Sequence, residues 1–415
     1  MSTRPIQRFC VLAAASACLL CAWPAAAAKP KVRAITAFVR LDRAQFKAQI
    51  AGALEVLRAA RSAFQAAGYE VQTIRISTQP FPEYIRGLQP EEALAFFRTL
   101  DLFAQKEGFD AAIGPAILAD ADDPRHAELL EEILVRTTIL NASIVVAGEG
   151  GVHWNAVRAA ARVILSLATR TPRSQGNFRF AATALLPTDT PFYPGSYHTG
   201  PGRQFAIGLE SANVVMEVFS EMRNSPAAAQ EALTAALSEH ARAIETTARR
   251  VSADTGWQFL GLDLSPAPLR DVSIGAALEN FTGARIGAPG TMTAAAMLTE
   301  ALRSVPVRQA GYNGLMLPVL EDTVLARRWS EGALTLDALL SYSAVCGTGL
   351  DVVPLPGEVT TKQLERIIGD MAALAVKLRK PLSARLLPVA GKKPGDRTEF
   401  DDPYLVNAVL QPFPQ

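Results

Sequence analysis

The stretch from Ser343 to Gly357 holds the residue types that could most readily do chemistry. Cys346 is the only cysteine after the first 21 residues, and it lies in a loop with Gly347 and Gly349. Glycine lets a backbone turn sharply and approach a ligand closely, and Asp351 adds a carboxylate nearby. Cys346 is therefore interpreted as a pocket-lining thiol or a nucleophile, and the alternative is a buried, unreactive apolar residue.

A second candidate is the Gly- and Pro-rich segment 192–203, which carries His198 and Arg203. A histidine there could transfer protons, and an arginine could hold an anion. Arg385 interrupts an apolar run near the C-terminus, so it should meet a carboxylate or an anionic ligand.

Three acidic residues follow or interrupt apolar runs in the same way. Asp263 lies within an apolar strand-like segment, and Glu321 and Asp322 directly follow the strand-like run 315–320. Burying a carboxylate is costly unless it is paired or bound to a metal. These acids could bind Mg²⁺, Ca²⁺ or Mn²⁺ through oxygen, or they could cap backbone and begin a helix. Asp263 and Asp351 are also candidates for the catalytic general acid or base. Asn313 joins Arg203, Gly347, Gly349 and Arg385 as a substrate-binding candidate.

Composition and motifs exclude several classes of protein. Lys and Arg number 41 and Asp and Glu number 40, so no basic field recommends nucleic acid as a partner. Beyond residue 28, the chain lacks the CxxC, HExxH, GxSxG and P-loop motifs of common zinc, protease, hydrolase and nucleotide sites. A small-molecule ligand remains the favoured partner, and a homo-oligomer is possible.

Residues 1–28 are typical of a secretory signal. Arg4 and Arg8 precede an apolar run from Phe9 to Trp23, and an alanine-rich cleavage region follows. The run is short for a membrane span, which needs roughly 20 residues. We therefore expect a periplasmic or secreted protein without stable membrane insertion, whose residues 29–415 form one domain.

The elements that must position these residues alternate along the chain. Helices with apolar residues at helical spacing, such as 43–67, follow short strand-like runs, such as 32–41. Repeated βα units predict parallel strands joined by right-handed crossovers. The number of strand-like runs exceeds a typical open sheet and favours a single large α/β barrel, whose sites would lie beyond the carboxyl ends of its strands.

Several of these stretches carry a resemblance to a known family. Segments 71–75, 198–210, 261–265, 311–322, 342–357 and 380–395 resemble the bacterial and archaeal family called domain of unknown function 711. That family is similar in fold to pyruvate formate-lyase-like glycyl radical enzymes. The resemblance implies a ten-stranded barrel of two parallel five-stranded halves.

The same resemblance would make Cys346 a thiyl cysteine and Gly391 a radical glycine. The sequence departs from that pattern, because it reads Pro388-Val-Ala-Gly-Lys392 where the enzymes have an arginine before the valine and an aromatic residue after the glycine. We therefore expect a non-radical enzyme, of lyase, isomerase or hydrolase type, that acts on a small anionic metabolite. The alternatives are a periplasmic binding protein without catalysis and a scaffold that assembles through its exterior.

Overall fold

A computed structural model describes residues 28–413, and a ten-stranded sheet forms its centre. All of the expected signal except Ala28 lies outside the described residues. The strands are β1 (Lys31–Val39), β2 (Val71–Thr78), β3 (Asp110–Pro115), β4 (Leu140–Gly148), β5 (Gly151–Val152), β6 (Phe180–Ala184), β7 (Gln204–Glu210), β8 (Gln258–Asp263), β9 (Gly349–Pro356) and β10 (Leu382–Val389).

The sheet is mixed, and its order is β8-β7-β1-β2-β3-β4-β6-β10-β9, with β5 paired to β4. The neighbours from β1 to β6 are parallel, as are the pairs β7–β8 and β9–β10. The two junctions β1–β7 and β6–β10 are antiparallel. Five parallel strands thus lie between two antiparallel junctions, which the expectation of an entirely parallel alternation did not include.

The sheet does not close into the expected barrel. The edge strands β8 and β9 do not pair with each other. Instead, Gln309 makes an isolated bridge to Leu262 in β8, and Pro318 makes one to Asp351 in β9. The α/β class is shown, whereas the closed barrel is not confirmed.

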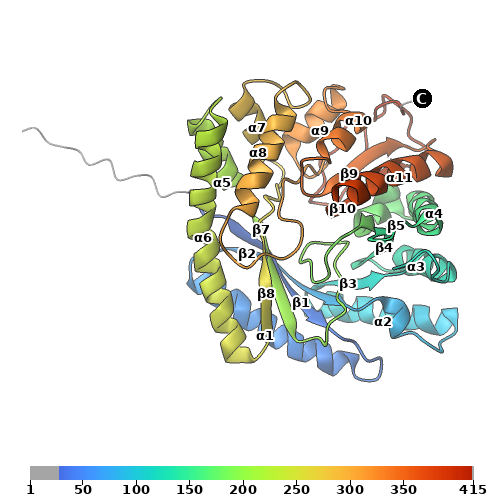
Figure 1. Cartoon of the computed structure of the whole chain (residues 1–415). Helices are drawn as coiled ribbons and strands as arrows, with labels where there is room; N and C mark the ends of the chain where they lie inside the picture. The colour runs from blue at the N-terminus through green and yellow to red at the C-terminus, as the bar shows by residue number, and fades with distance from the viewer. Residues whose placement is uncertain (1–27, 414–415) are drawn as a thin grey trace, which may run out of the picture.

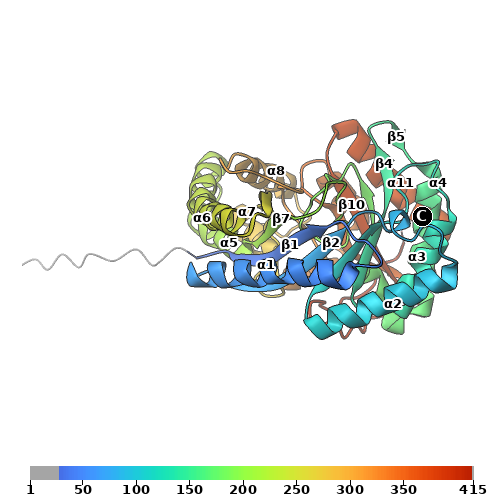
Figure 2. The ribbon, with the colours of Figure 1, turned by 90° about the horizontal axis from the view of Figure 1, so that it is seen from below.

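Helices pack around the outside of the sheet (Figure 1). The long helix α6 lies at one side beside α5, and α1 and α2 run along the face seen from below in Figure 2. The α-helices are α1 (Phe46–Ala66), α2 (Pro90–Glu107), α3 (Arg125–Arg136), α4 (Trp154–Arg170), α5 (Ala212–Glu221), α6 (Pro226–Thr255), α7 (Ile274–Thr282), α8 (Thr291–Arg303), α9 (Thr323–Ser330), α10 (Leu336–Tyr342) and α11 (Thr361–Leu378). Short 3₁₀ segments cover Phe81–Glu83 and Pro172–Arg179.

Local sequence explains where these helices begin and end. In α2, Pro90 occupies the first turn, where a missing N–H costs nothing, and Glu92 accepts a bond from the backbone of Gln89 at 2.8 Å. The helix ends at Gly108, whose φ of 73° suits glycine. Within residues 28–413, no helix is both long and apolar enough to cross a membrane.

The run 315–320, expected to be a strand, is not one. The apolar pattern of this run reflects burial rather than strand pairing, because its apolar side chains are fully buried, namely Leu315, Leu317, Val319 and Leu320. Pro318 has no N–H to donate, and this segment makes only the single bridge to β9. The segment instead carries Glu321 into the interior of the molecule.

Candidate functional site

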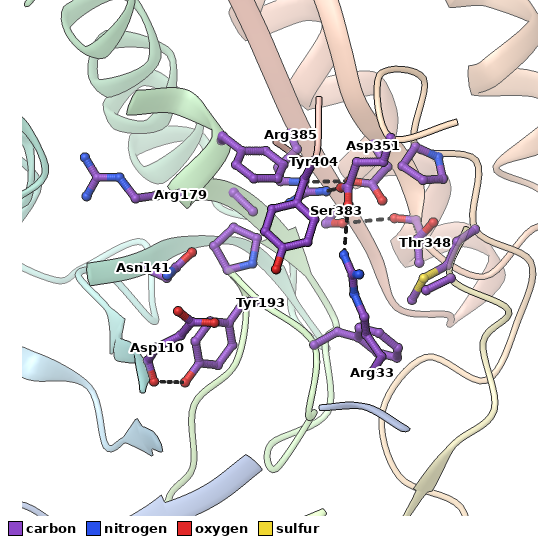
Figure 3. A pocket seen from close by; sticks show the side chains of 18 of the residues that line it. Arg33, Asp110, Asn141, Arg179, Tyr193, Thr348, Asp351, Ser383, Arg385 and Tyr404 are labelled. Carbon is purple, nitrogen blue, oxygen red and sulfur yellow. Dashed lines mark hydrogen bonds and ion pairs between the residues drawn. The ribbon is translucent and has the colours of Figure 1, made fainter. Parts of the chain in front are cut away.

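A cavity of about 230 Å³ is lined by residues from strands that are far apart in the sheet order, from β1 to the edge strand β9. Arg33, Arg75 and Asp110 come from β1, β2 and β3, while Asp351 and Arg385 come from β9 and β10. Strands this far apart in a sheet can share a cavity only if the sheet curls around it. Figure 3 shows Asp110 and Tyr193 at one end and Asp351 and Arg385 at the other, with the ring of Tyr404 between them in this view.

Irregularities in the strand pairing orient the side chains of Arg33 and Arg385. The register of β1 against β7 shifts between Val32 and Ala34, so that Arg33 is the extra residue. The register of β10 against β9 shifts between Ala384 and Leu386, which sets Arg385 opposite Asp351 and Val352. Val352 has a φ of 48°, an unusual value for a β-branched residue. Bulges of this kind redirect side chains beside functional sites.

At this end of the cavity, buried charges form one connected network. The Arg385 guanidinium donates to Asp351 at 2.7 Å and to Glu321, and Arg33 lies 3.4 Å from both Glu321 and Glu210. Burial raises the pKa of Asp351, and Glu321 adds to that rise while Arg385 opposes it. Burial would lower the pKa of Arg385, but its two carboxylate neighbours outweigh burial and raise it. These two guanidinium groups are therefore already committed to carboxylates within the protein.

Arg75, near the other end of the cavity, makes fewer polar contacts with the protein than Arg33 and Arg385 do. Its guanidinium lies 4.8 Å from the centre of the Tyr193 ring, and its nearest carboxylate oxygen, on Asp110, is 3.7 Å away. Arg75 donates no hydrogen bond to any residue in the described part of the chain, and its Nε is buried. Burial lowers the pKa of Arg75, and Asp110 only partly opposes this effect. Tyr193 is fixed beneath it, because its hydroxyl donates to the carbonyl of Ile76 at 2.6 Å.

Arg179 also reaches the cavity wall, but its guanidinium is used internally. It donates to the carbonyls of Leu140 at 3.0 Å and Leu134 at 2.7 Å. Burial lowers its pKa to about 10. Arg179 therefore joins the end of α3 to the start of β4 and leaves Arg75 as the cation best placed to receive a ligand.

Asp402 and Tyr404, from the C-terminal segment, complete the wall. The Asp402 carboxylate accepts one hydrogen bond, from the backbone of Tyr404 at 2.9 Å, and has no ion-pair partner among residues 28–413. Burial raises the pKa of Asp402. The Tyr404 ring lies 5.0 Å from the Arg33 guanidinium. A raised pKa moves a carboxyl group in a cavity toward the range used in general acid–base catalysis.

Of the residues singled out from the sequence, Glu321, Asp351 and Arg385 line this cavity. The pairing expected of Arg385 with a carboxylate is present twice. Their catalytic or binding roles remain predictions.

Asp263, Asn313 and Asp322 lie elsewhere. Asp263 is fully buried and accepts bonds from the backbone of Ser265, Tyr312 and Asn313 and from the Ser265 hydroxyl, at 2.6–3.1 Å. The Asn313 side chain likewise bonds backbone, at Leu264 and Ala310. Both residues therefore tie the loop after β8 to the segment 310–314.

Asp322 caps helix α9. It accepts bonds from the backbone of Val324 and Leu325 at 2.9 and 3.0 Å, and from Ser273 and Gly275. Asp263, Glu321 and Asp322 consequently do not form one ligand set. Within the described chain, no group of three or more His, Cys, Asp or Glu side chains is arranged to hold a metal ion.

His198 and Arg203 also lie outside the cavity lining. His198 is fully buried beside Phe38, with ring centres 5.9 Å apart, and neither ring nitrogen has a hydrogen-bond partner in the described structure. Burial lowers the pKa of His198, which favours the neutral imidazole. Arg203 is exposed at the surface. The structure thus separates these two residues from Asp351 and Arg385.

Cys346 is fully buried in the hydrophobic core, and its loop is packed tightly. A side chain on Gly347 would come within 2.5 Å of the Gly314 backbone, and Gly349 has a φ of 92°. The Lys380 ammonium donates to the carbonyls of Cys346, Ser343 and Ala344. The loop is therefore a support that delivers Thr348 and Asp351 to the cavity.

The sequence argument missed Arg33, Arg75, Asp110 and Tyr193. A usable signal existed for two of them, because Arg33 and Arg75 interrupt strand-like runs just as Arg385 does. The partners of these residues are up to 288 positions away along the chain, and spacing alone does not reveal them.

Comparison with known proteins now places the chain. The family model "Uncharacterised ACR (DUF711)" matches residues 26–401. The chain belongs to this family. It is 36% identical to a UPF0210 protein of Pyrobaculum aerophilum over 364 residues, which cover 83% of this chain and 79% of the relative. A UPF0210 protein of Methanopyrus kandleri is 32% identical over 325 residues, covering 75% and 72%.

A solved structure, the anaerobic ribonucleotide reductase from Thermotoga maritima in complex with dATP and CTP, aligns with a TM-score of 0.42. The alignment covers 85% of this chain and 75% of that chain, at 7% identity. This likeness is too low to carry a conclusion about activity.

Proposed function

We propose that the protein is an enzyme that binds a small molecule through an anionic group at Arg75 and converts it in the cavity without a radical. The observation that carries the proposal is the Arg75 guanidinium, which lines the cavity and donates no hydrogen bond within the described structure. A buried charge without a close partner is costly, and a ligand anion would relieve that cost. A guanidinium can also hold a carboxylate or phosphate through two parallel hydrogen bonds.

We assign proton transfer to Asp402. Asp351, whose position is fixed by its ion pair with Arg385, is the second candidate for this role. Burial raises the pKa of both carboxyl groups, which brings them toward the range useful for general acid–base catalysis. Asp402 is the freer of the two, because Arg385 already engages Asp351 at 2.7 Å. These roles suit a lyase, isomerase or hydrolase reaction on a small anionic metabolite.

The positions of Gly391 and Cys346 support a mechanism without a radical. Gly391 lies in an exposed turn after β10, and Cys346 is enclosed in the core rather than among the residues that line the cavity. The departure of segment 388–392 from the radical motif supports the same proposal.

Binding is tested by thermal shift and calorimetry with a panel of small carboxylates and phosphates. We expect at least one to stabilise the protein, and Arg75→Gln to weaken it at least about tenfold, since a charged hydrogen bond contributes roughly 1.5–3 kcal/mol. Arg203→Gln is the matched control and should leave binding unchanged. Equal binding by wild type and Arg75→Gln would contradict the proposal.

Turnover is followed separately by proton NMR of the bound compound. Conversion that is lost in Asp402→Asn supports an enzyme. Tight binding of a compound that is never converted would instead favour the alternative, a binding protein without catalysis.

The site of action is part of the proposal. We propose that the protein works in the periplasm or outside the cell, and the support is the signal-like sequence of residues 1–28.

A further inference from the structure

The charged residues that line the cavity are equal in number, but not all of them are held by a close ion pair. Four arginines and four acids line the wall: Arg33, Arg75, Arg179, Arg385, Asp110, Glu321, Asp351 and Asp402. Arg33 and Arg385 pair with Glu321 and Asp351, and Arg179 is used on backbone carbonyls.

Arg75 and two acids, Asp110 and Asp402, therefore remain for a ligand, and Asp402 is the acid without an ion-pair partner among residues 28–413. The Arg75 guanidinium has only Asp110, at 3.7 Å. The Asp402 carboxylate has no ion pair within residues 28–413, and one of its oxygens accepts a hydrogen bond from the backbone N–H of Tyr404. A ligand with a negative charge alone would satisfy Arg75 but would add a further negative charge to a cavity that already holds the unpaired Asp402.

The rest of the wall suits a small ligand with an apolar part. Aromatic side chains line the cavity, namely Phe178, Phe192, Tyr193, Tyr312 and Tyr404. Aromatic faces accept apolar groups and also attract an ammonium. The volume of about 230 Å³ is below the roughly 300–1,000 Å³ of sites for drug-sized ligands.

We propose that the cavity takes a zwitterion of amino-acid size, with its carboxylate on Arg75 and its ammonium on Asp402. This inference rests on the proposed function and narrows it, because it adds a positive group to the anionic one. Tyr404, two residues beyond Asp402, also lines the cavity, and its ring gives the apolar part of the ligand a surface to pack on.

The test compares three sets of compounds on matched skeletons by calorimetry with the full protein. The sets are the standard amino acids in both enantiomers, their 2-hydroxy acid counterparts, and the amines that lack the carboxylate. We expect at least one amino acid to bind, with its hydroxy acid and its amine each at least about tenfold weaker, because each lacks one charged contact.

Two variants locate the ammonium subsite. Asp402→Asn should reduce the preference for the amino acid over its hydroxy acid to within about twofold, while binding of the hydroxy acid still depends on Arg75. Asp401→Asn is the control, since Asp401 is exposed and pairs with Arg173 at 3.3 Å. It should leave the preference intact.

The outcomes separate this inference from the proposed function. Hydroxy acids that bind as tightly as amino acids, in an Arg75-dependent way, would overturn the zwitterion and leave the anion site standing. An amino-acid preference that persists in Asp402→Asn would overturn the role of Asp402. If nothing binds from these sets or from the carboxylate and phosphate panel, both proposals are wrong.

Discussion

Asp263 shows how a fully buried carboxylate is held by backbone rather than by a counter-ion. It receives four hydrogen bonds, and Gly311 is required beside it because an added side-chain carbon there would come within 2.2 Å of its Oδ2. Burial raises the pKa of Asp263 even though these bonds favour its charged form. An acid within an apolar run can therefore be structural, and only the location of its donors distinguishes this from a catalytic role.

The loop that contains Cys346, Gly347 and Gly349 gives the first stability prediction. Gly347→Ala should destabilise the protein by more than about 2 kcal/mol, because the clash would be with the Gly314 backbone, which cannot rotate away. Cys346→Ser should cost less, since serine nearly preserves the volume of a buried thiol. Urea unfolding of both variants measures the difference. A larger loss in Cys346→Ser would show that the loop is held by the thiol rather than by close backbone approach.

At the scale of elements, the sequence predicted most strands and helices because burial and periodicity are local signals. The predicted strand 32–41 and helix 43–67 correspond to β1 (Lys31–Val39) and α1 (Phe46–Ala66). The prediction of a strand at 315–320 was wrong, because this apolar segment has no partner strand along its length. The bulges at Arg33 and Arg385 were not predictable, since a register shift depends on a neighbouring strand far away in the chain.

The contact between α7 and α9 gives a pH-dependent prediction. Arg328 in α9 donates to both carboxylate oxygens of Glu279 in α7, at 2.6 and 2.8 Å. Burial would raise the pKa of Glu279, but the hydrogen bonds from Arg328 outweigh it and the pKa lies below 4.5. The resulting stability is complete above the unfolded pKa and is lost as the pH falls through the lower folded pKa.

Glu279→Gln should therefore cost about 1–2 kcal/mol at pH 7, and less as the solution is acidified below about pH 4. Urea unfolding at both pH values measures this loss. Glu365→Gln is a suitable control, because its partner Lys362 is exposed and 3.6 Å away, and such pairs contribute little. A loss in Glu279→Gln that did not change with pH would point to packing rather than charge.

At the scale of the whole molecule, one curled sheet brings the first and last strands to the same cavity. The family expectation of an α/β fold is shown, but the edges β8 and β9 remain unpaired with each other. The sequence could not predict this, because the bridging residues Gln309 and Pro318 belong to segments without regular structure of their own.

Export gives the prediction for the whole chain. When the full sequence is expressed in a bacterium with a periplasm, we expect the purified protein to begin near Lys29 and to appear in the periplasmic fraction. Intact mass and cell fractionation measure this. Leu19→Arg, which interrupts the apolar run, should block processing. An unprocessed wild-type chain in the cytoplasm would contradict the proposal.

The network around Arg33 also joins parts of the chain that are far apart in sequence. Arg33 lies near the start of the described chain, whereas Glu321, Arg385 and the Tyr404 ring, 5.0 Å from its guanidinium, lie in its last third. Contacts so distant in sequence form slowly, because a long loop must close first. Until the segment with Tyr404 docks, this wall of the cavity is unfinished and the Arg33 guanidinium lacks the ring that packs against it.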